Sequence, residues 1–521
     1  YFGPGVESIS CTGKATITNM GAEIGATCSI FPYDKRMETY LNSTDRKEIA
    51  SLANDHTSLL QADPEVEQNP EKFFDKIIEI DLSNLEPHVV GPHTPDLARP
   101  ISELSDEIDS NDYIDKISVA LIGSCTNSSY EDMSRSSSVA KQAETYGIKA
   151  KIPLLVTPGS EQIRSTIERD GQMDALRQID AKVLANACGP CIGQWNRAES
   201  EKGQPNTIVT SYNRNFPKRN DGNGETMNFI ASPEIVIALG LAGRLTFNPL
   251  KDELRSGDGT LYKLEAPQIA PDVPQNGFLQ GDDTYVEPPE NGDAIDVVID
   301  PSSNRLQVLE PFSSWDGDDF IEAALLIKVA GKCTTDHISP AGPWLRYRGH
   351  LDNLSDNMLT GAVNAYTGKI GVGFDRISGE ADIPLPQIAR GYKRSGAQWV
   401  VVGDDNYGEG SSREHAALSP RYLGAVAIIV KSFARIHETN LKKQGLLAVT
   451  FANSDDYDLI KEQDKISLLG LNELKPGTLI KCVLHHADGS EDVIELRHTY
   501  NEAQIKWFKT GSALNLLRNA P

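Results

Sequence analysis

Three cysteines at two places in the chain are the residues best suited to bind a soft metal. Cys188 and Cys191 form a CxxC motif in the run VLANACGPCIGQW, and Cys125 lies in the run GSCTNS. A structural zinc site closes with four Cys or His ligands, and an iron–sulfur cluster normally takes four protein ligands. Because no fourth ligand is obvious, the three thiolates predict a metal site with one open position. A redox pair of the thioredoxin type would explain the CxxC motif but not Cys125.

Two basic segments could bind an anionic substrate beside such a metal. Residues 211–220 (SYNRNFPKRN) combine three cations with three carboxamides in an acidic chain. The guanidinium groups of Arg214 and Arg219 match carboxylates in a bidentate fashion. A second basic segment, RYRGH, contains Arg348. A loop with ordinary surface salt bridges is the alternative interpretation of the first segment.

A third anion-binding feature follows the apolar run 399–403, which predicts a strand. Residues 406–415 (NYGEGSSREH) predict a Gly-rich turn, and Ala416 to Leu418 begin a helix whose N-terminus bears Ser411, Ser412 and Arg413. Free amide groups and the helix dipole favour an anion at such a place. The hydroxyls could equally serve as N-caps. Since no Walker lysine follows the turn, a nucleotide-binding loop is excluded.

The elements that must position these residues alternate between strand and helix. Residues 117–123 (ISVALIG) and 152–157 (IPLLVT) are short apolar runs, with helical stretches between and after them. This alternation predicts an α/β fold with a parallel sheet covered on both faces. Cys125 directly follows the first run, and Cys188 follows the run 181–185. Because open α/β sheets bind ligands at the carboxyl ends of their strands, both cysteine loops are expected at the ligand-binding edge.

The first segment of the chain contributes one more candidate pair. Asn19 and Glu23 are four residues apart, about one helical turn, so both could face the same site. A solvated or capping pair is the alternative. A further helical stretch is expected near residues 36–52.

Composition limits the partners of the protein. Among 521 residues, 74 acidic and 50 basic side chains give a formal net charge of −24, which repels phosphate backbones, so nucleic acid is not expected as a main partner. The seven cysteines are sparse and odd in number, unlike those of a secreted disulfide scaffold. No apolar run reaches the length of about 18 residues that a membrane span needs, so no membrane partner is expected.

A Pro-rich, acidic stretch divides the chain. Residues 264–316 suit a linker that runs over the surface, since proline cannot continue a helix or a central strand. The end of an N-terminal α/β domain is expected at residues 1–85 and an α/β domain with the cysteines at 86–263. The linker at 264–316 is then followed by a C-terminal domain at 317–521.

Together these features suit a hydro-lyase that acts on a di- or tricarboxylate. An open metal can act as a Lewis acid on a substrate hydroxyl, arginines can hold carboxylates, and a desolvated serine can remove a proton. Five motifs resemble those of the aconitase family, and the resemblance covers essentially the whole chain: GSCTNSSYEDM (123–133), ANACGPCIGQW (185–195), SYNRNF (211–216), CTTDHIS (333–339) and NYGEGSSREHAAL (406–418). It is closest to the mitochondrial members, which isomerise citrate to isocitrate through cis-aconitate on a [4Fe–4S] cluster.

The resemblance implies the residues around the cluster. Cys125, Cys188 and Cys191 would hold the cluster and leave its fourth iron to substrate and water. Asn19 and Asn213 would line the cluster environment.

The resemblance also implies the catalytic and substrate-binding residues. Ser411 would be the general base, Glu23 would help to bind the water or hydroxide, and Asp336 would orient neighbouring groups. Ser412 would bind substrate beside the base. Four arginines would hold the substrate carboxylates: Arg214, Arg219, Arg348 and Arg413.

The family's architecture sets further expectations. It implies a multi-domain α/β protein with α/β domains around the cluster and a C-terminal swivelling α/β domain. A monomer in the mitochondrial matrix, with a small tricarboxylate as its partner, is expected on the same basis.

Two departures from the family pattern leave alternatives open. Family members carry an earlier segment with further active-site residues that nothing here matches, so the sequence is expected to be a C-terminal fragment that is inactive by itself. Pro340 and the stretch 366–387 also depart from the pattern, so homocitrate or methylcitrate is an alternative substrate. A non-catalytic role in a larger assembly is the alternative to an enzyme.

Overall fold

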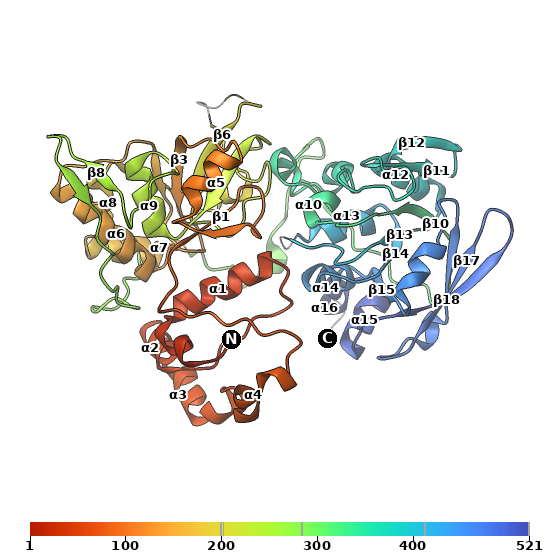
Figure 1. Cartoon of the computed structure of the whole chain (residues 1–521). Helices are drawn as coiled ribbons and strands as arrows, with labels where there is room; N and C mark the ends of the chain where they lie inside the picture. The colour runs from red at the N-terminus through yellow and green to blue at the C-terminus, as the bar shows by residue number, and fades with distance from the viewer. Residues whose placement is uncertain (198–200, 202, 283–284, 411–412, 519–521) are drawn as a thin grey trace. The chain divides into compact units, whose positions relative to one another are not determined.

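Two compact units, Tyr1–Pro288 and Pro289–Pro521, make up the chain (Figure 1). The computed structural model describes residues 1–197, 201, 203–282, 285–410 and 413–518. None of the described helices is both long and apolar enough to span a bilayer.

The first unit is built on a seven-stranded sheet. Its strand order is β2-β1-β7-β6-β3-β4-β5, in which β3 to β7 are parallel and the edge strands β1 and β2 are antiparallel. The strands are β1 (His88–Val90), β2 (Ala98–Pro100), β3 (Ile117–Ile122), β4 (Leu154–Val156), β5 (Ala181–Val183), β6 (Asn206–Thr210) and β7 (Thr226–Ile230). The predicted parallel α/β sheet is therefore confirmed.

Both faces of the central strand β3 are covered, as its apolar sequence requires. Successive side chains of a strand point to opposite faces. Ala120 and Ile122 belong to the large core beneath the helices, whereas Val119 and Leu121 belong to a small cluster that contains Cys191. One face of the sheet is thus closed by helices and the other partly by a cysteine loop.

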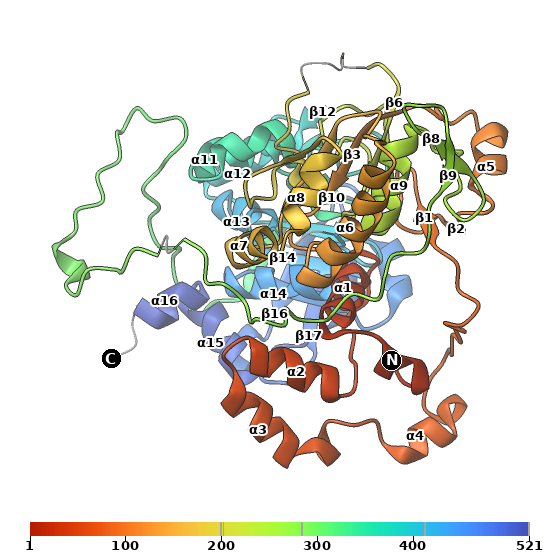
Figure 2. The ribbon, with the colours of Figure 1, turned by 90° about the vertical axis from the view of Figure 1, so that its left-hand side faces the viewer.

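Helices of the first unit pack mainly on that large core. Helix α6 contacts α8 and α9, and α9, which is buried along its whole length, lies against β3 (Figure 2). The helices are α5 (Leu104–Ser110), α6 (Tyr130–Thr145), α7 (Glu161–Arg169), α8 (Gln172–Gln178) and α9 (Pro233–Ala242). A short hairpin follows, formed by β8 (Glu253–Arg255) and β9 (Leu261–Lys263).

Four helices precede the sheet: α1 (Cys11–Glu23), α2 (Lys35–Ser43), α3 (Lys47–Asp55) and α4 (Pro64–Gln68). The single helical stretch predicted near residues 36–52 was wrong, because the chain breaks between α2 and α3. Asp45 has a φ of 58°, which no right-handed helix can accommodate. The residues before it, Asn42 to Thr44, are poor helix formers, which explains the break.

The second unit contains a closed barrel. Its strand order is β10-β13-β14-β15-β18-β17-β16, with parallel pairing from β10 to β15 and antiparallel pairing elsewhere. The strands are β10 (Phe320–Lys328), β13 (Trp399–Gly403), β14 (Ala425–Val430), β15 (Leu447–Phe451), β16 (Lys465–Leu469), β17 (Ile480–His485) and β18 (Glu491–Arg497). A separate hairpin comprises β11 (Val372–Asp375) and β12 (Glu380–Pro384).

Apolar residues on the barrel strands alternate between two cores. Val400 and Val402 lie in one buried cluster with residues of the antiparallel strands, and Val401 lies in another with residues of the helices. The helices are α10 (Thr335–Ile338), α11 (Leu351–Leu354), α12 (Leu385–Ser395), α13 (His415–Tyr422), α14 (Arg435–Lys443), α15 (Glu502–Thr510) and α16 (Ala513–Arg518).

The stretch between β9 and β10 is mostly extended chain (Figure 2). Among its described residues, a short 3-10 turn, Gly292–Ala294, is the only helical element. Its first half is tied to the first unit, since Leu279 N donates to Thr166 Oγ1 at 3.0 Å. Its second half is tied to the second unit, where Asn515 Nδ2 donates to Phe312 O at 2.7 Å.

A buried histidine links the antiparallel strands of the barrel. His486 bonds Asp464 through Nδ1 at 2.7 Å and Asp492 through Nε2 at 3.0 Å. Hydrogen bonds with Asp492 and Asp464 raise the pKa of His486 above its ordinary value. The fold therefore favours the charged imidazolium.

Replacing His486 by alanine should lower the free energy of unfolding of the second unit by about 3 kcal/mol, the order of cost of breaking a buried charged pair. The pKa of His486 in the folded protein lies above the unfolded value of about 6.5. The stabilisation by charged His486 is therefore complete below about pH 6.5 and is lost as the pH rises through the raised pKa of the folded protein. Urea unfolding from about pH 5 to pH 9 should show this loss in the unsubstituted protein only. Identical pH profiles for the two proteins would contradict the prediction.

Candidate functional site

The predicted cysteine loops gather at a switch point of the first sheet. From β3 the chain proceeds outward through β4 and β5 on one side and through β6 and β7 on the other. Open α/β sheets bind ligands beyond the carboxyl ends of the strands at such a reversal. Cys125 comes three residues after β3, Cys188 five residues after β5, and the basic segment 211–220 directly after β6. The sheet therefore brings these three segments to one edge.

The three cysteine thiols interact electrostatically. Cys125 and Cys188 are exposed, Cys191 is buried, and all are free thiols. Burial raises the pKa of Cys191 most, Arg214 and Arg219 act to lower it, and the charges of the other two cysteines raise it further. The structure thus places both arginines within electrostatic range of the thiols.

The basic segment also supports the backbone of the CxxC loop. Cys191 N donates to Cys188 O at 2.8 Å, which closes a short 3-10 turn. Arg219, which is buried, donates from Nε to Cys191 O at 2.9 Å. Asn220 Nδ2 donates to Pro190 O at 3.1 Å. The role of Asn220 was not predicted, and its only signal was the cluster of carboxamides in the segment.

The loop after β3 is tied to the same segment. Ser211 Oγ accepts a hydrogen bond from Gly123 N at 3.1 Å, and Ser211 O accepts one from Asn127 Nδ2 at 2.9 Å. Gly123 has a φ of 120°, and a Cβ there would lie 2.3 Å from Thr157 O, so only glycine fits. Ser211 was not predicted as a site residue. Its position directly after β6, at the carboxyl end of a strand, was the available signal.

Helix α1 brings Asn19 to this edge. Asn19 Oδ1 accepts hydrogen bonds from Thr126 Oγ1 at 3.0 Å and from Asn213 Nδ2 at 2.7 Å. With Cys125 and Thr126, Asn19 also lines a cavity of about 350 Å³. Asn19 and Asn213, both predicted, are therefore in contact beside a cysteine loop. Thr126 was not predicted as a site residue.

Glu23, one turn further along α1, pairs with Arg214. Their side chains are 9% and 15% exposed, so the pair is largely screened from water. Glu23 and Asn19 both contact the basic segment, although Asn19, unlike Glu23, remains exposed to solvent.

A second group of predicted residues lies in the second unit. Asp336, in α10, pairs with Arg413 at 2.6 Å, and Arg413 Nη1 donates to Ser339 O at 2.8 Å. Arg348 is exposed, and its carbonyl oxygen lies 3.1 Å from His415 Nε2. Ser339 was not predicted, although it ends the CTTDHIS motif.

The Gly-rich turn runs beside the segment that leads to Asp336. Gly408 N donates to Cys333 O at 2.7 Å, and Thr335 N donates to Glu409 O at 2.9 Å. This pairing explains why Asp336 and Arg413, far apart in sequence, come together.

The helix predicted to begin at Ala416 after the turn is confirmed within one residue. Helix α13 begins at His415 with Glu414 as its N-cap residue, so Arg413 precedes the helix and is not in its first turn. Ser411 and Ser412, the predicted base and its neighbour, lie outside the described residues.

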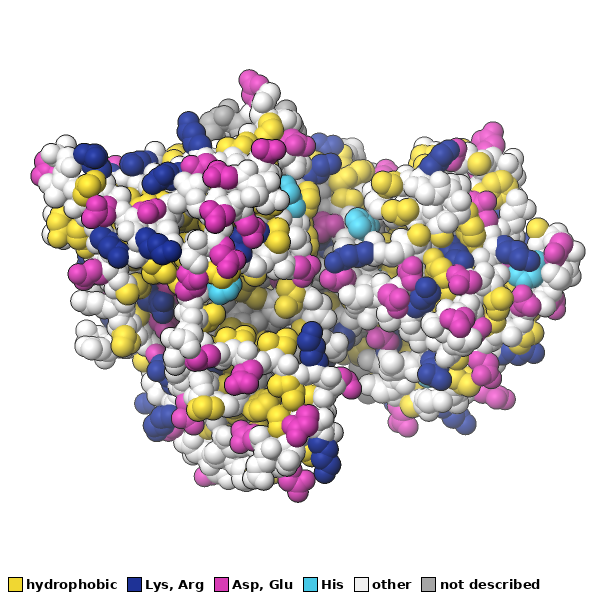
Figure 3. Space-filling view, viewed as in Figure 1, with side chains coloured by type: hydrophobic (Ala, Val, Ile, Leu, Met, Phe, Trp, Pro, Cys, Tyr) yellow, Lys and Arg dark blue, Asp and Glu magenta, His cyan; other side chains and the backbone are white. Residues whose placement is uncertain are grey.

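Surface charge agrees with the composition. On the face drawn in Figure 3, basic side chains of the described residues are interspersed with acidic ones. No broad basic surface for a phosphate backbone is seen among those residues on that face.

Comparisons with known proteins match both units. The model of the aconitase family (aconitate hydratase) matches residues 1–243, and that of the aconitase C-terminal domain matches residues 323–454. A probable mitochondrial aconitate hydratase from Dictyostelium discoideum is 56% identical over 520 residues, which is 100% of this chain and 66% of that protein. The mitochondrial aconitate hydratases of Gracilaria gracilis and Saccharomyces cerevisiae are 56% and 53% identical, over 99% of this chain and 66% of theirs. The chain thus spans just under two thirds of the length of these relatives.

Proposed function

Because the chain belongs to the aconitase family, we propose that the protein isomerises citrate to isocitrate by dehydration to cis-aconitate and rehydration. The observation that best supports this is the meeting of three free cysteines and two arginines at the switch point of the first sheet. The names of the relatives further support a mitochondrial location. We also propose that the protein is a monomer in the mitochondrial matrix.

The cysteines fit an iron–sulfur cluster better than a single metal ion. Among the described residues, no three His, Cys, Asp or Glu side chains lie close enough together to hold one ion. In a cluster, by contrast, each cysteine binds a different iron, so the sulfurs need not converge on one point. The donors are soft thiolates, and Arg214 and Arg219 can offset their negative charge. We propose that Cys125, Cys188 and Cys191 hold the cluster.

When bound, a cluster with one open iron supplies a Lewis acid for the substrate hydroxyl and carboxylate. Around it, Asn19 and Asn213 would restrain the cysteine loops through their shared hydrogen bond. Glu23, held by Arg214, would accept hydrogen bonds from the water or hydroxide that the reaction exchanges.

Four arginines and two serines are proposed to bind the substrate and move its proton. Arg214, Arg219, Arg348 and Arg413 are proposed to hold substrate carboxylates, with Ser412 beside them. Asp336 would orient Arg413 through the ion pair between them. Ser411 is proposed to take the proton from the substrate carbon and to return it on rehydration. By holding the carboxylates of citrate, the arginines would fix the position of the carbon that loses its proton.

A direct assay tests the proposed reaction. The full-length protein, reconstituted without oxygen, should form isocitrate from citrate, with cis-aconitate detectable in ultraviolet absorbance. Homocitrate and methylcitrate serve as competing substrates in the same assay. A protein that dehydrates one of these faster than citrate would redirect the proposal to that substrate, and one that turns over none would remove it.

Replacing Arg413 by lysine should weaken substrate binding by about 1.5–3 kcal/mol, because a point charge cannot reproduce a bidentate guanidinium contact. The Michaelis constant for citrate should therefore rise by roughly one to two orders of magnitude. Arg394→Lys, at an exposed arginine of α12, is the matched control and should leave the Michaelis constant unchanged. An unchanged constant for citrate and for homocitrate would remove Arg413 from the site.

A further inference from the structure

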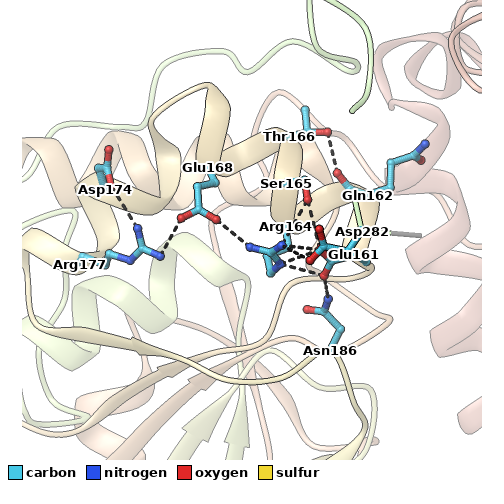
Figure 4. A network of polar contacts seen from close by, with 10 residues as sticks. All are labelled: Glu161, Gln162, Arg164, Ser165, Thr166, Glu168, Asp174, Arg177, Asn186 and Asp282. Carbon is cyan, nitrogen blue, oxygen red and sulfur yellow. Dashed lines mark hydrogen bonds and ion pairs between the residues drawn. The ribbon is translucent and has the colours of Figure 1, made fainter. Parts of the chain in front are cut away.

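A polar network on α7 reaches the loop that carries Cys188 (Figure 4). Glu161, the first residue of α7, accepts hydrogen bonds from Arg164 Nε at 3.0 and 2.8 Å and from Ser165 Oγ at 3.2 Å. Its Oε2 also accepts a hydrogen bond from Asn186 Nδ2 at 2.9 Å. Asn186 lies two residues before Cys188. The network therefore joins a helix to the cysteine loop.

The rest of the network holds Arg164 in place. Its Nη1 donates to Glu168 at 2.7 Å, and Glu168 also accepts a hydrogen bond from Arg177 at 3.1 Å. Asp282, from the stretch after β9, comes within 3.7 Å of Arg164. Isolated surface ion pairs contribute little, but a bidentate arginine within a charge network has a defined geometry. The hydrogen bonds from Arg164 lower the pKa of Glu161 to about 2, so Glu161 is ionised at neutral pH.

The loop between β5 and Cys188 has few other anchors. Leu184 N donates to Val156 O at 2.8 Å and extends the sheet ladder by one residue. Within the described stretches of the chain, Asn186 is the only one of residues 184–188 whose side chain makes a hydrogen bond. Cys188 itself is exposed. The contact with Glu161 therefore restrains the loop on the N-terminal side of Cys188, whereas Asn220, bonded to Pro190 O, restrains it on the C-terminal side.

We propose that Glu161 is a positioning residue, which holds Asn186 and thereby fixes the loop that aims Cys188 at the cluster. This role rests on the proposed function, since it requires Cys188 to be a cluster ligand. An ionised acceptor suits the role because charge-assisted hydrogen bonds are stronger than neutral ones.

Alkylation of the metal-free, full-length protein tests this role. Mass spectrometry of the Cys188 peptide measures how fast iodoacetamide modifies this cysteine. The rate should be about 3- to 10-fold higher in Asn186→Ala and in Glu161→Ala, because each variant loses one charge-assisted hydrogen bond. Glu161→Gln, which keeps an acceptor oxygen, should give an intermediate rate. Cys125, exposed on a separate loop, should react at an unchanged rate in every variant. The control Asp174→Ala removes only the outer end of the network and should change neither rate.

A double variant distinguishes one shared contact from two separate effects. Glu161→Ala combined with Asn186→Ala should react no faster than either single variant, because the contact is already lost. In the reconstituted protein, iron release to a chelator should be faster by the same about 3- to 10-fold in each single variant. Unchanged Cys188 rates, additive effects or an equal rise at Cys125 would overturn the proposal. If the unsubstituted protein takes up no cluster, the proposed function fails, and the alkylation rates still decide whether Glu161 positions the loop.

Discussion

Replacing Cys125 by serine should leave the full-length protein without a stable cluster and without measurable turnover of citrate. Among the described residues, three thiols lie on the loops at the switch point, and a serine hydroxyl is a hard, weakly acidic donor that does not replace a thiolate on iron. Loss of a residue that merely supports a metal ligand lowers metal affinity by about 10- to 100-fold, so loss of the ligand itself should cost more. Iron content after anaerobic reconstitution and citrate turnover measure both effects.

The matched control for this change is Cys28→Ser. Cys28 is also an exposed free thiol of the first unit, but it belongs to neither cysteine loop. This variant should keep its iron and its activity. A Cys125→Ser protein that holds as much iron as the control would remove Cys125 from the ligand set.

Replacing Ser411 by alanine should lower kcat by at least about 10²-fold, the lower end of what a positioned general base contributes, and leave the Michaelis constant nearly unchanged. An ordinary serine hydroxyl is too weak an acid to serve as a base at neutral pH, so its alkoxide needs nearby positive charge. Arg413 follows two residues later, and α13 begins at His415. Steady-state kinetics with citrate measure the two constants separately.

Ser419→Ala provides the matched control for the change at Ser411. Ser419 lies in α13, is fully buried, and its hydroxyl makes no hydrogen bond in the described structure. Its removal should therefore leave kcat within a few-fold of the unsubstituted protein. If Ser411→Ala keeps its turnover while the Michaelis constant rises, Ser411 binds substrate and the base lies elsewhere.

Local sequence patterns predicted the individual elements well. The apolar runs at 117–123 and 399–403 became β3 and β13, because buried parallel strands need apolar residues on both faces. The closure of the barrel could not be predicted from such local patterns. It depends on pairing between β10 and β16, whose residues are far apart in the chain, and nothing in either strand's own sequence identifies the partner.

The site shows the same division between local and distant effects. Cys125 and Cys188 could be placed because each follows a predictable strand. Ser211 and Asn220 could not, because each bonds the backbone of a distant loop. Arg219 was predicted from its type alone, which could not reveal that its Nε would support the carbonyl of Cys191.

The most direct measurement is the iron and sulfide content of the full-length protein, reconstituted without oxygen, together with the formation of isocitrate from citrate. We expect about four irons and four sulfides per chain, with one iron lost on mild oxidation along with the activity and both restored by ferrous iron. A protein that binds only zinc, a cluster that also needs one of the cysteines outside the two loops, or a complete cluster without turnover of citrate would contradict this expectation.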